Sequence, residues 1–259
     1  MKTRLEQLGE VLIVIIIVAL LCIVFSYPPI EQSLQYHDFI DSKKHFDISN
    51  FWNVVSNVPF FIVGLLGLMK LNLFTKLHIQ YSILFIGILL VSIGSSYYHL
   101  NPNNDTLVWD RLPMTVAFMA LFSILISENV NDKIGRKILL PLLVLGLASV
   151  IYWLLKNDLR PYVLIQFCPI IIMPIILVCF ESKYSSVSGY WFLLLAYIVA
   201  KLLEYFDAQA YAIFKISGHS LKHIISAIGL FALYVYYKNR IPREEKNSAL
   251  KKKNSVKTI

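Results

Sequence analysis

The stretch IQYSILFIGILLVSIGSSYYHL, residues 79–100, decides the fold class. It runs for 22 residues without an aspartate, glutamate, lysine or arginine. A helix needs about 20 predominantly apolar residues to cross a bilayer core about 30 Å thick. We therefore expect this stretch to be a transmembrane helix.

Seven further apolar runs of 17 to 20 residues have the same character; they are residues 11–27, 51–69, 109–126, 138–155, 161–180, 190–206 and 221–237. None shows the alternation of about ten residues that is typical of an outer-membrane barrel strand. The sequence therefore predicts an all-α, polytopic membrane bundle with eight spans.

Composition agrees with this interpretation. Of the 259 residues, 57% are hydrophobic and 15% are charged, whereas soluble domains carry about 25% charged residues. The net charge of +8 is concentrated in residues 238–257, which hold eight of the 24 lysines and arginines. A basic segment directly after a span is what anionic headgroups favour, so we expect a membrane partner and no nucleic-acid partner.

The distribution of lysine and arginine also predicts the topology. With the N-terminus inside, the inner segments hold 16 of these residues and the outer loops hold 5, so both termini are expected in the cytoplasm. The first run is longer than the apolar part of a usual signal peptide and lacks a small-residue cleavage site. We expect a signal-anchor helix in residues 1–30, a domain with the other seven spans in residues 31–237 and a basic cytoplasmic tail in residues 238–259.

Polar side chains lie near the ends of three spans. Ser95 and His99 are four residues apart near the end of one span, Asp110 opens the next, and His219 and His223, again four apart, open the last. Residues at this spacing share one helix face, and the predicted topology places all five at the outer end of the bundle. Ionisable groups within a membrane are costly and mark functional sites.

Three imidazoles that meet at one depth suit zinc. Two histidines on one helix and a third from another would supply three ligands and leave the fourth position open for water. Such a metal lowers the pKa of water and polarises a carbonyl. Asp110 is then the expected proton acceptor, and Ser95 the hydrogen-bond donor to the water or the oxyanion.

Four motifs carry a resemblance to a known family. The segments GSSYYH (94–99), WDRLPM (109–114) and HSLKH (219–223) resemble, in order, the three motifs of the alkaline ceramidases, and NFWNVVSN (50–57) resembles the start of that family's first core helix. The family belongs to a superfamily of membrane hydrolases that includes the adiponectin-receptor-like proteins. The resemblance implies that residues 31–237 form a seven-helix ceramidase-like hydrolase domain, with residues 11–27 as an added N-terminal helix.

The resemblance also implies roles for single residues. His99, His219 and His223 match the zinc ligands, Asp110 the catalytic carboxylate and Ser95 the motif serine. Eukaryotic members bind calcium in an acidic loop before the Phe-Trp-Asn segment, and Asp38, Asp41 and Asn50 fall at matching positions. Asn50 replaces an acid there and Lys43 falls near another ligand position, and fewer carboxylates weaken calcium binding.

Other polar residues are open to two interpretations. Asn53, Ser56 and Asn57 could support a histidine or make hydrogen bonds between helices. Lys201 and Glu204 are expected to pair, with Asp207 near the site. Lys222 is expected to extend to the membrane interface.

Three function classes follow. The first is a zinc-dependent amidase that cleaves the N-acyl bond of ceramide or a related N-acyl lipid into a long-chain base and a fatty acid. The second is a receptor of the adiponectin-receptor type that retains the zinc site. The third, a transporter or haem protein, is disfavoured because no internal repeat with broken half-helices is present and haem needs no Ser or Asp beside its ligands. HExxH, GxSxG and Gly-rich phosphate motifs are absent, and WDRLPM resembles the ceramidases more than the receptors.

Overall fold

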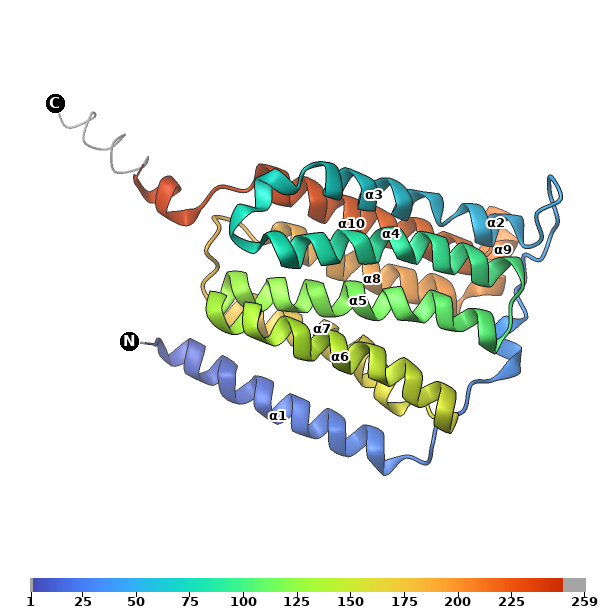
Figure 1. The fold of residues 1–259 in the computed structure, drawn as a ribbon, viewed down its shortest axis with the longest axis horizontal. Helices are drawn as coiled ribbons and strands as arrows, with labels where there is room; N and C mark the ends of the chain where they lie inside the picture. Colours follow the sequence, from blue (N-terminus) through green and yellow to red (C-terminus); the bar gives the residue numbers. More distant parts are fainter. Residues whose placement is uncertain (1, 249–259) are drawn as a thin grey trace.

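The computed structural model describes residues 2–248, and its architecture is a bundle of helices that run roughly along one axis (Figure 1). The helices are α1 (Arg4–Ser26), α2 (Phe51–Val55), α3 (Val58–Met69), α4 (His78–Leu100), α5 (Asn104–Asn129), α6 (Asp132–Lys156), α7 (Arg160–Cys179), α8 (Ser188–Tyr205), α9 (Asp207–Phe214) and α10 (Gly218–Asn239), with 3-10 turns η1 (Leu34–His37) and η2 (Leu71–Leu77). The predicted all-α fold is confirmed. The last part of the expected basic tail, residues 249–259, lies outside the described residues.

Seven helical segments within residues 2–248 are long and apolar enough to cross a membrane: α1, α2 with α3, α4, α5, α6, α7 and α10. They correspond to seven of the eight expected spans and make the chain a multi-pass membrane protein. The one expected span that is left, residues 190–206, corresponds to α8, which has 18 residues and is not among the seven. It nevertheless belongs to the bundle, because it packs along α10.

The order of the helices sets which ends meet. α3 packs on α4, α4 on α5, and α5 on α6 and α7, while α1 lies on the outside against α7 (Figure 1). Most of the apolar side chains of α1 are exposed, which suits a helix that faces lipid. The end of α4 and the start of α10 lie at the same end of the bundle, here called the histidine end; α10 ends at the opposite, tail end (Figure 1).

The second expected span is not one continuous helix. α2 ends at Val55, and α3 begins at Val58 with Pro59 in its first turn, where a missing N–H costs nothing. Ser56 and Asn57 form the break and are buried. The break turns polar side chains and backbone groups into the bundle at the histidine end.

A linker of residues 27–50 connects α1 to α2 across the histidine end (Figure 1). Its first part is fixed by Asp158, which accepts a hydrogen bond from the backbone of Ile30, and by Arg160, which donates to the carbonyl of Tyr27 at 2.8 Å. Hydrogen bonds from Arg160 hold the pKa of the Asp158 carboxyl below its ordinary value of 3.8. A lowered pKa means that this anchor keeps its charge above about pH 4 and weakens only in stronger acid.

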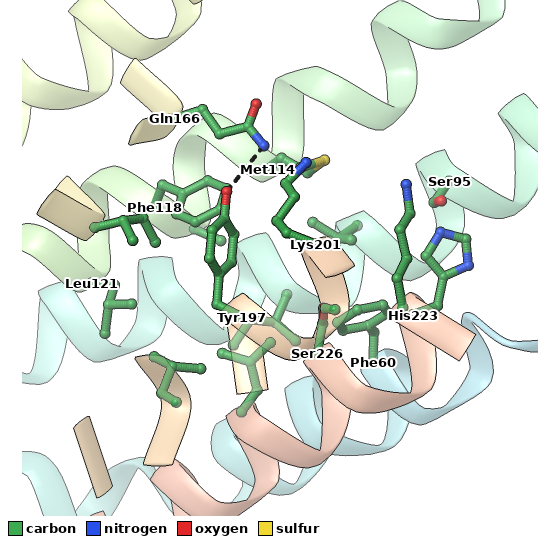
Figure 2. Close-up of a pocket in the computed structure, with 18 of the residues that line it drawn as sticks. Phe60, Ser95, Met114, Phe118, Leu121, Gln166, Tyr197, Lys201, His223 and Ser226 are labelled. Atoms are coloured by element: carbon green, nitrogen blue, oxygen red, sulfur yellow. Dashed lines mark hydrogen bonds between the residues drawn. The ribbon is translucent and has the colours of Figure 1, made fainter. Parts of the chain in front are cut away.

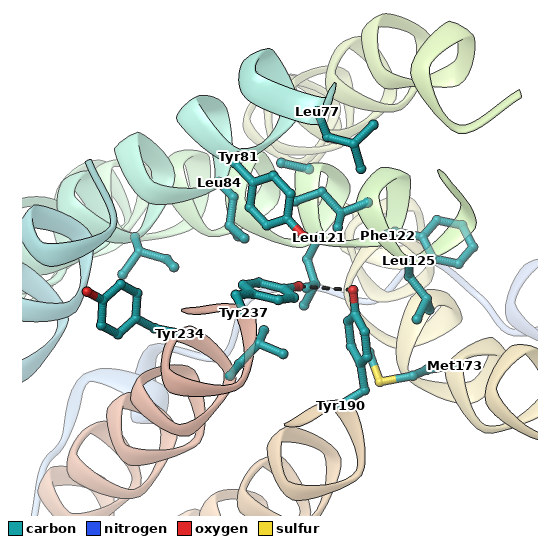
Figure 3. Packing of buried hydrophobic residues seen from close by; sticks show 14 of the residues in the cluster. Leu77, Tyr81, Leu84, Leu121, Phe122, Leu125, Met173, Tyr190, Tyr234 and Tyr237 are labelled. Carbon is teal, nitrogen blue, oxygen red and sulfur yellow. Dashed lines mark hydrogen bonds between the residues drawn. The ribbon is translucent and has the colours of Figure 1, made fainter. Parts of the chain in front are cut away.

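The tail end is held by a buried polar cluster. Glu128 of α5 accepts hydrogen bonds from the hydroxyls of Tyr81 and Tyr190 and forms an ion pair with Arg240, which directly follows α10. Tyr237 donates to Tyr190 at 3.1 Å (Figure 3). One carboxylate therefore joins α4, α5, α8 and the end of α10.

Replacement of Glu128 by glutamine should destabilise the protein without disturbing the histidine end. The side chain of Arg240 is only 6% exposed, and a buried ion pair that loses one partner typically costs about 3–5 kcal/mol. We expect a lower thermal midpoint in detergent and an unchanged metal content. Glu244→Gln is the matched control because Glu244 is exposed; equal midpoints for the two variants would contradict a structural role for Glu128.

Candidate metal centre and lipid cavity

Three histidines converge at the histidine end. His99 lies in the last turn of α4, and His219 and His223 lie in the first two turns of α10. All three are buried, and each offers a ring nitrogen within 4.8 Å of those of the other two. The predicted histidine set is therefore brought together, as a group that could hold a metal ion.

The donor set and its spacing fit zinc. The Nε2 atoms of His99 and His219 are 3.4 Å apart, and tetrahedral ligands with Zn–N bonds of about 2.0–2.1 Å are separated by roughly 3.3 Å. On the other side of its ring, the Nδ1 of His223 is 2.9 Å from the hydroxyl of Ser56. Such a partner fixes the ring orientation and leaves Nε2 free for a metal.

Backbone geometry places the start of α10. Ser217 caps the helix by accepting a hydrogen bond from the Ser220 N–H, and the Asp207 carboxylate accepts one from the His219 N–H at 2.9 Å. Gly218 has no space for a side chain, because a Cβ there would lie 1.9 Å from the carbonyl oxygen of Leu203. Asp207 was expected near the site, and the structure confirms it.

The hydrogen bonds of α2 tie the same region to α10. The Asn53 side-chain oxygen accepts from the hydroxyls of Ser217 and Ser220, and the Asn57 amide donates to the carbonyl of Asn53. Of the two interpretations open for these polar residues, Ser56 supports a histidine, whereas Asn53 and Asn57 make hydrogen bonds within and between helices.

Ser95 lies near the end of α4 and Asp110 near the start of α5, both at the histidine end of the bundle. Gly94 permits this arrangement, since a Cβ there would lie 1.9 Å from the carbonyl oxygen of Trp109 and push α4 away from α5. Ser95 and Asp110 line the same cavity as His223.

This cavity extends from the histidines into the apolar middle of the bundle. It comprises about 1120 Å³ of space between atoms, its mouth included, and its wall is mostly apolar. Figure 2 shows Ser95 and His223 at one end, and Phe118, Leu121 and Tyr197 away from them. Further apolar side chains in the wall are Phe60, Leu84, Ile88, Met173, Leu194 and Leu230. A polar centre that opens into an apolar cavity suits a ligand with a polar group on a long apolar chain.

The linker covers the histidines from outside. The ring centroid of Phe39 is 4.8 Å from that of His99 and 4.6 Å from that of His219. The preceding His37 is held by the Tyr98 hydroxyl at 2.8 Å and the Asn104 side chain at 3.0 Å. Sequence reasoning missed Phe39, because an apolar residue in a predicted acidic loop gives no sign of what it packs against.

The three residues expected to bind calcium differ in burial and in hydrogen bonding. Asp38 is exposed, whereas Asp41 is 1% exposed and neither of its carboxylate oxygens has a hydrogen-bond partner. The Asn50 amide donates to the His99 carbonyl at 2.8 Å, so it caps the end of α4. Calcium binding by Asp38, Asp41 and Asn50 stays a prediction.

The expected Lys201–Glu204 pair is present, with 2.7 Å between Nζ and Oε2. The prediction for Lys222 was wrong. Its side chain is mostly buried, lines the cavity and pairs with Glu204 instead of extending to the interface. The presence of a carboxylate on the neighbouring α8 explains the difference, and the local sequence around Lys222 does not reveal it.

A scan against protein-family models identifies a relationship that agrees with this geometry. The model described as Ceramidase matches residues 44–256. The chain belongs to the ceramidase family. A comparison with curated proteins finds no match. Membership of this family supports a hydrolase that acts on a ceramide-type amide, and hence a lipid substrate.

Loss of the Ser56 hydroxyl should weaken metal binding without removing a ligand. Ser56→Ala removes the hydrogen bond to His223, and loss of such a supporting partner typically lowers metal affinity about 10–100-fold. Competition with a zinc chelator of known affinity measures this change. Ser82→Ala is the control, because Ser82 bonds only to the backbone of its own helix at the other end of α4. An affinity equal to that of the parent would exclude a supporting role for Ser56.

Proposed function

We propose that the protein is a zinc-dependent intramembrane amidase that hydrolyses the N-acyl bond of ceramide or a related N-acyl lipid. The observation that carries the proposal is a group of three histidines, one of which, His223, lines a mostly apolar cavity together with Ser95 and Asp110. Family membership supports the amide as the bond that is cleaved.

His99, His219 and His223 would hold the metal. Bound there, zinc would polarise the amide carbonyl and lower the pKa of water. Asp110 accepts the proton of the attacking water and later returns it to the departing amine, because one group must serve as base and then as acid. Ser95 lines the same cavity as Asp110 and His223 and serves as the hydrogen-bond donor to the water or the oxyanion.

The rest of the chain binds and shields the lipid. The apolar cavity wall accepts an acyl or long-chain-base segment of the substrate. Phe39 and the linker cover the histidines and exclude water from that side, which strengthens electrostatic interactions at the centre. Incubation of purified protein with a panel of ceramides and other N-acyl lipids, followed by mass spectrometry of the released base and fatty acid, tests the reaction and defines the substrate.

Asp110→Asn should keep the metal and the fold but lower turnover about 10²–10⁴-fold, the usual contribution of a positioned acid–base group. His223→Ala should instead lose metal, activity and some stability together, because metal-binding energy contributes to folding. Zinc content, N-acyl hydrolysis and the thermal midpoint are measured for each variant. Asp105→Asn is the matched control, since Asp105 is exposed one turn earlier in α5.

Hydrolysis at the parent rate by Asp110→Asn with zinc bound would show that the carboxylate is structural. The receptor alternative would then be favoured, because a receptor needs the metal site but not the proton acceptor.

The excess of lysine and arginine in the inner segments, 16 against 5, supports cytoplasmic termini and a reaction centre at the opposite face. Asn103 directly precedes α5 and caps it at the histidine end. A cysteine introduced there should react with a membrane-impermeant thiol reagent added outside intact cells. Cysteine introduced at Lys251 should react only after permeabilisation. The reverse pattern would invert the topology.

A further inference from the structure

Glu204 binds two lysines from two different helices at the edge of the cavity. Lys201 comes from the same helix, α8, one turn before Glu204, and its Nζ is 2.7 Å from Oε2. Lys222 comes from α10 and binds the other oxygen, Oε1. All three side chains line the cavity that contains Ser95, Asp110 and His223, and Figure 2 shows Lys201 on the cavity wall.

A single lysine would be enough to pair with Glu204. The second ammonium group adds a positive charge and three N–H donors. In the structure, Lys201 and Lys222 each donate one side-chain hydrogen bond, and both bonds go to Glu204. The Lys222 side chain is 18% exposed, so few of its donors can be satisfied by bulk water. Because ionisable groups are costly within a membrane and mark functional sites, the arrangement points to a ligand with oxygen acceptors.

The position of Lys222 relates this ligand to the reaction centre. Lys222 lies between His219 and His223 in the first turns of α10, and it turns into the cavity although a lysine at a helix end can extend to the interface. Asp110 lines the same cavity and brings the carboxylates there to two, equal in number to the lysines, so the case for a ligand rests on the ammonium donors of Lys222 and not on an excess of positive charge. An anion beside Lys222 would therefore lie at the boundary between the histidines and the apolar cavity.

We propose that Lys222 and Lys201, held by Glu204, form a subsite for an anionic group, a carboxylate, carried by a long-chain lipid. The proposal rests on the proposed function, because the lipid occupies the same cavity. The carboxylate has two chemical sources: the fatty acid released by amide hydrolysis, or an acidic group on the amine half of the substrate, as in an N-acyl amino acid. Ammonium–carboxylate hydrogen bonds are among the strongest in proteins, so this subsite selects lipids by charge while the apolar wall selects them by chain.

Equilibrium binding to the detergent-purified protein, measured by native mass spectrometry, tests the subsite without requiring turnover. The probes are palmitate, 1-hexadecanol and N-palmitoylglycine, which share a 16-carbon chain and differ in the polar group. We expect the parent protein to bind at least one of the two acids about tenfold or more tightly than the alcohol.

Lys222→Met should remove most of this preference and leave binding of the alcohol unchanged, whereas Lys222→Arg should keep it. Lys215→Met is the matched control, because Lys215 is exposed at the end of α9 and its ammonium bonds to a backbone carbonyl. A loss confined to palmitate identifies the product acid as the ligand, and a loss confined to N-palmitoylglycine identifies an acidic substrate.

Equal binding of acids and alcohol by the parent protein would overturn the subsite without any need for a variant. An acid preference that survives in Lys222→Met with its parent fold would also overturn it. The amidase proposal fails separately: a parent protein that binds acids through Lys222 but cleaves no N-acyl lipid would retain the subsite and reject the enzyme.

Discussion

The meeting of the end of α4 with the start of α10 is the constraint on which the rest of the histidine end depends. His99 reaches this point from α4, and His219 and His223 reach it from α10. Asp207 accepts a hydrogen bond from the backbone of α10, and the Asn50 amide donates one to the backbone of α4. The Asn53 side chain also accepts one from the Ser220 hydroxyl of α10. In an apolar surrounding a buried polar group without a partner is costly, so these bonds hold the helix ends in one relative position. The convergence of the imidazoles is a consequence of that position.

Both ends of the bundle bury polar side chains, but they differ in how many of the buried polar atoms have hydrogen-bond partners. At the tail end, Glu128, two tyrosines and Arg240 satisfy one another within the bundle. Among the described residues, one buried side-chain atom at the tail end, Oδ1 of Asn129, has no hydrogen-bond partner, whereas the histidine end has several, including Nδ1 of His99 and both carboxylate oxygens of Asp41. A fully paired cluster stabilises, whereas unpaired groups at a cavity or beneath a loop indicate where ions, water or substrate bind. The mostly apolar wall of the cavity lies between the polar groups of the histidine end and those of the tail end.

The sequence predicted what depends on local pattern. Apolar runs of sufficient length identified the helices, and the spacing of His99, Asp110, His219 and His223 placed them at one depth, because helix periodicity and span length are properties of the chain alone. It did not predict the break at Ser56 and Asn57, because residues 51–69 have the length and the apolar character of a single helix. The packing of Phe39 on the histidines and the inward direction of Lys222 were also beyond it, because both depend on which helices become neighbours. Membership of the ceramidase family and the convergence of the three histidines agree with the motifs. Calcium binding rests only on the residue types in the loop and stays a prediction.

The reaction and the choice of lipid also differ in this way: the first depends on residues within motifs, and the second depends on which helices become neighbours. In the proposed reaction the histidines, Asp110 and Ser95 act on an amide whatever chain is attached to it, and these residues lie near helix ends that the motifs specify. The choice of lipid depends on the cavity wall, where α8 and α10 lie side by side and bring Lys201 and Lys222 to one carboxylate. A neutral lipid would leave donors of the mostly buried Lys222 without acceptors, and an anionic one would satisfy them. Since unpaired donors in an apolar cavity cost more than paired ones, charge on the lipid decides how well it is held beside a centre that is otherwise indifferent to it.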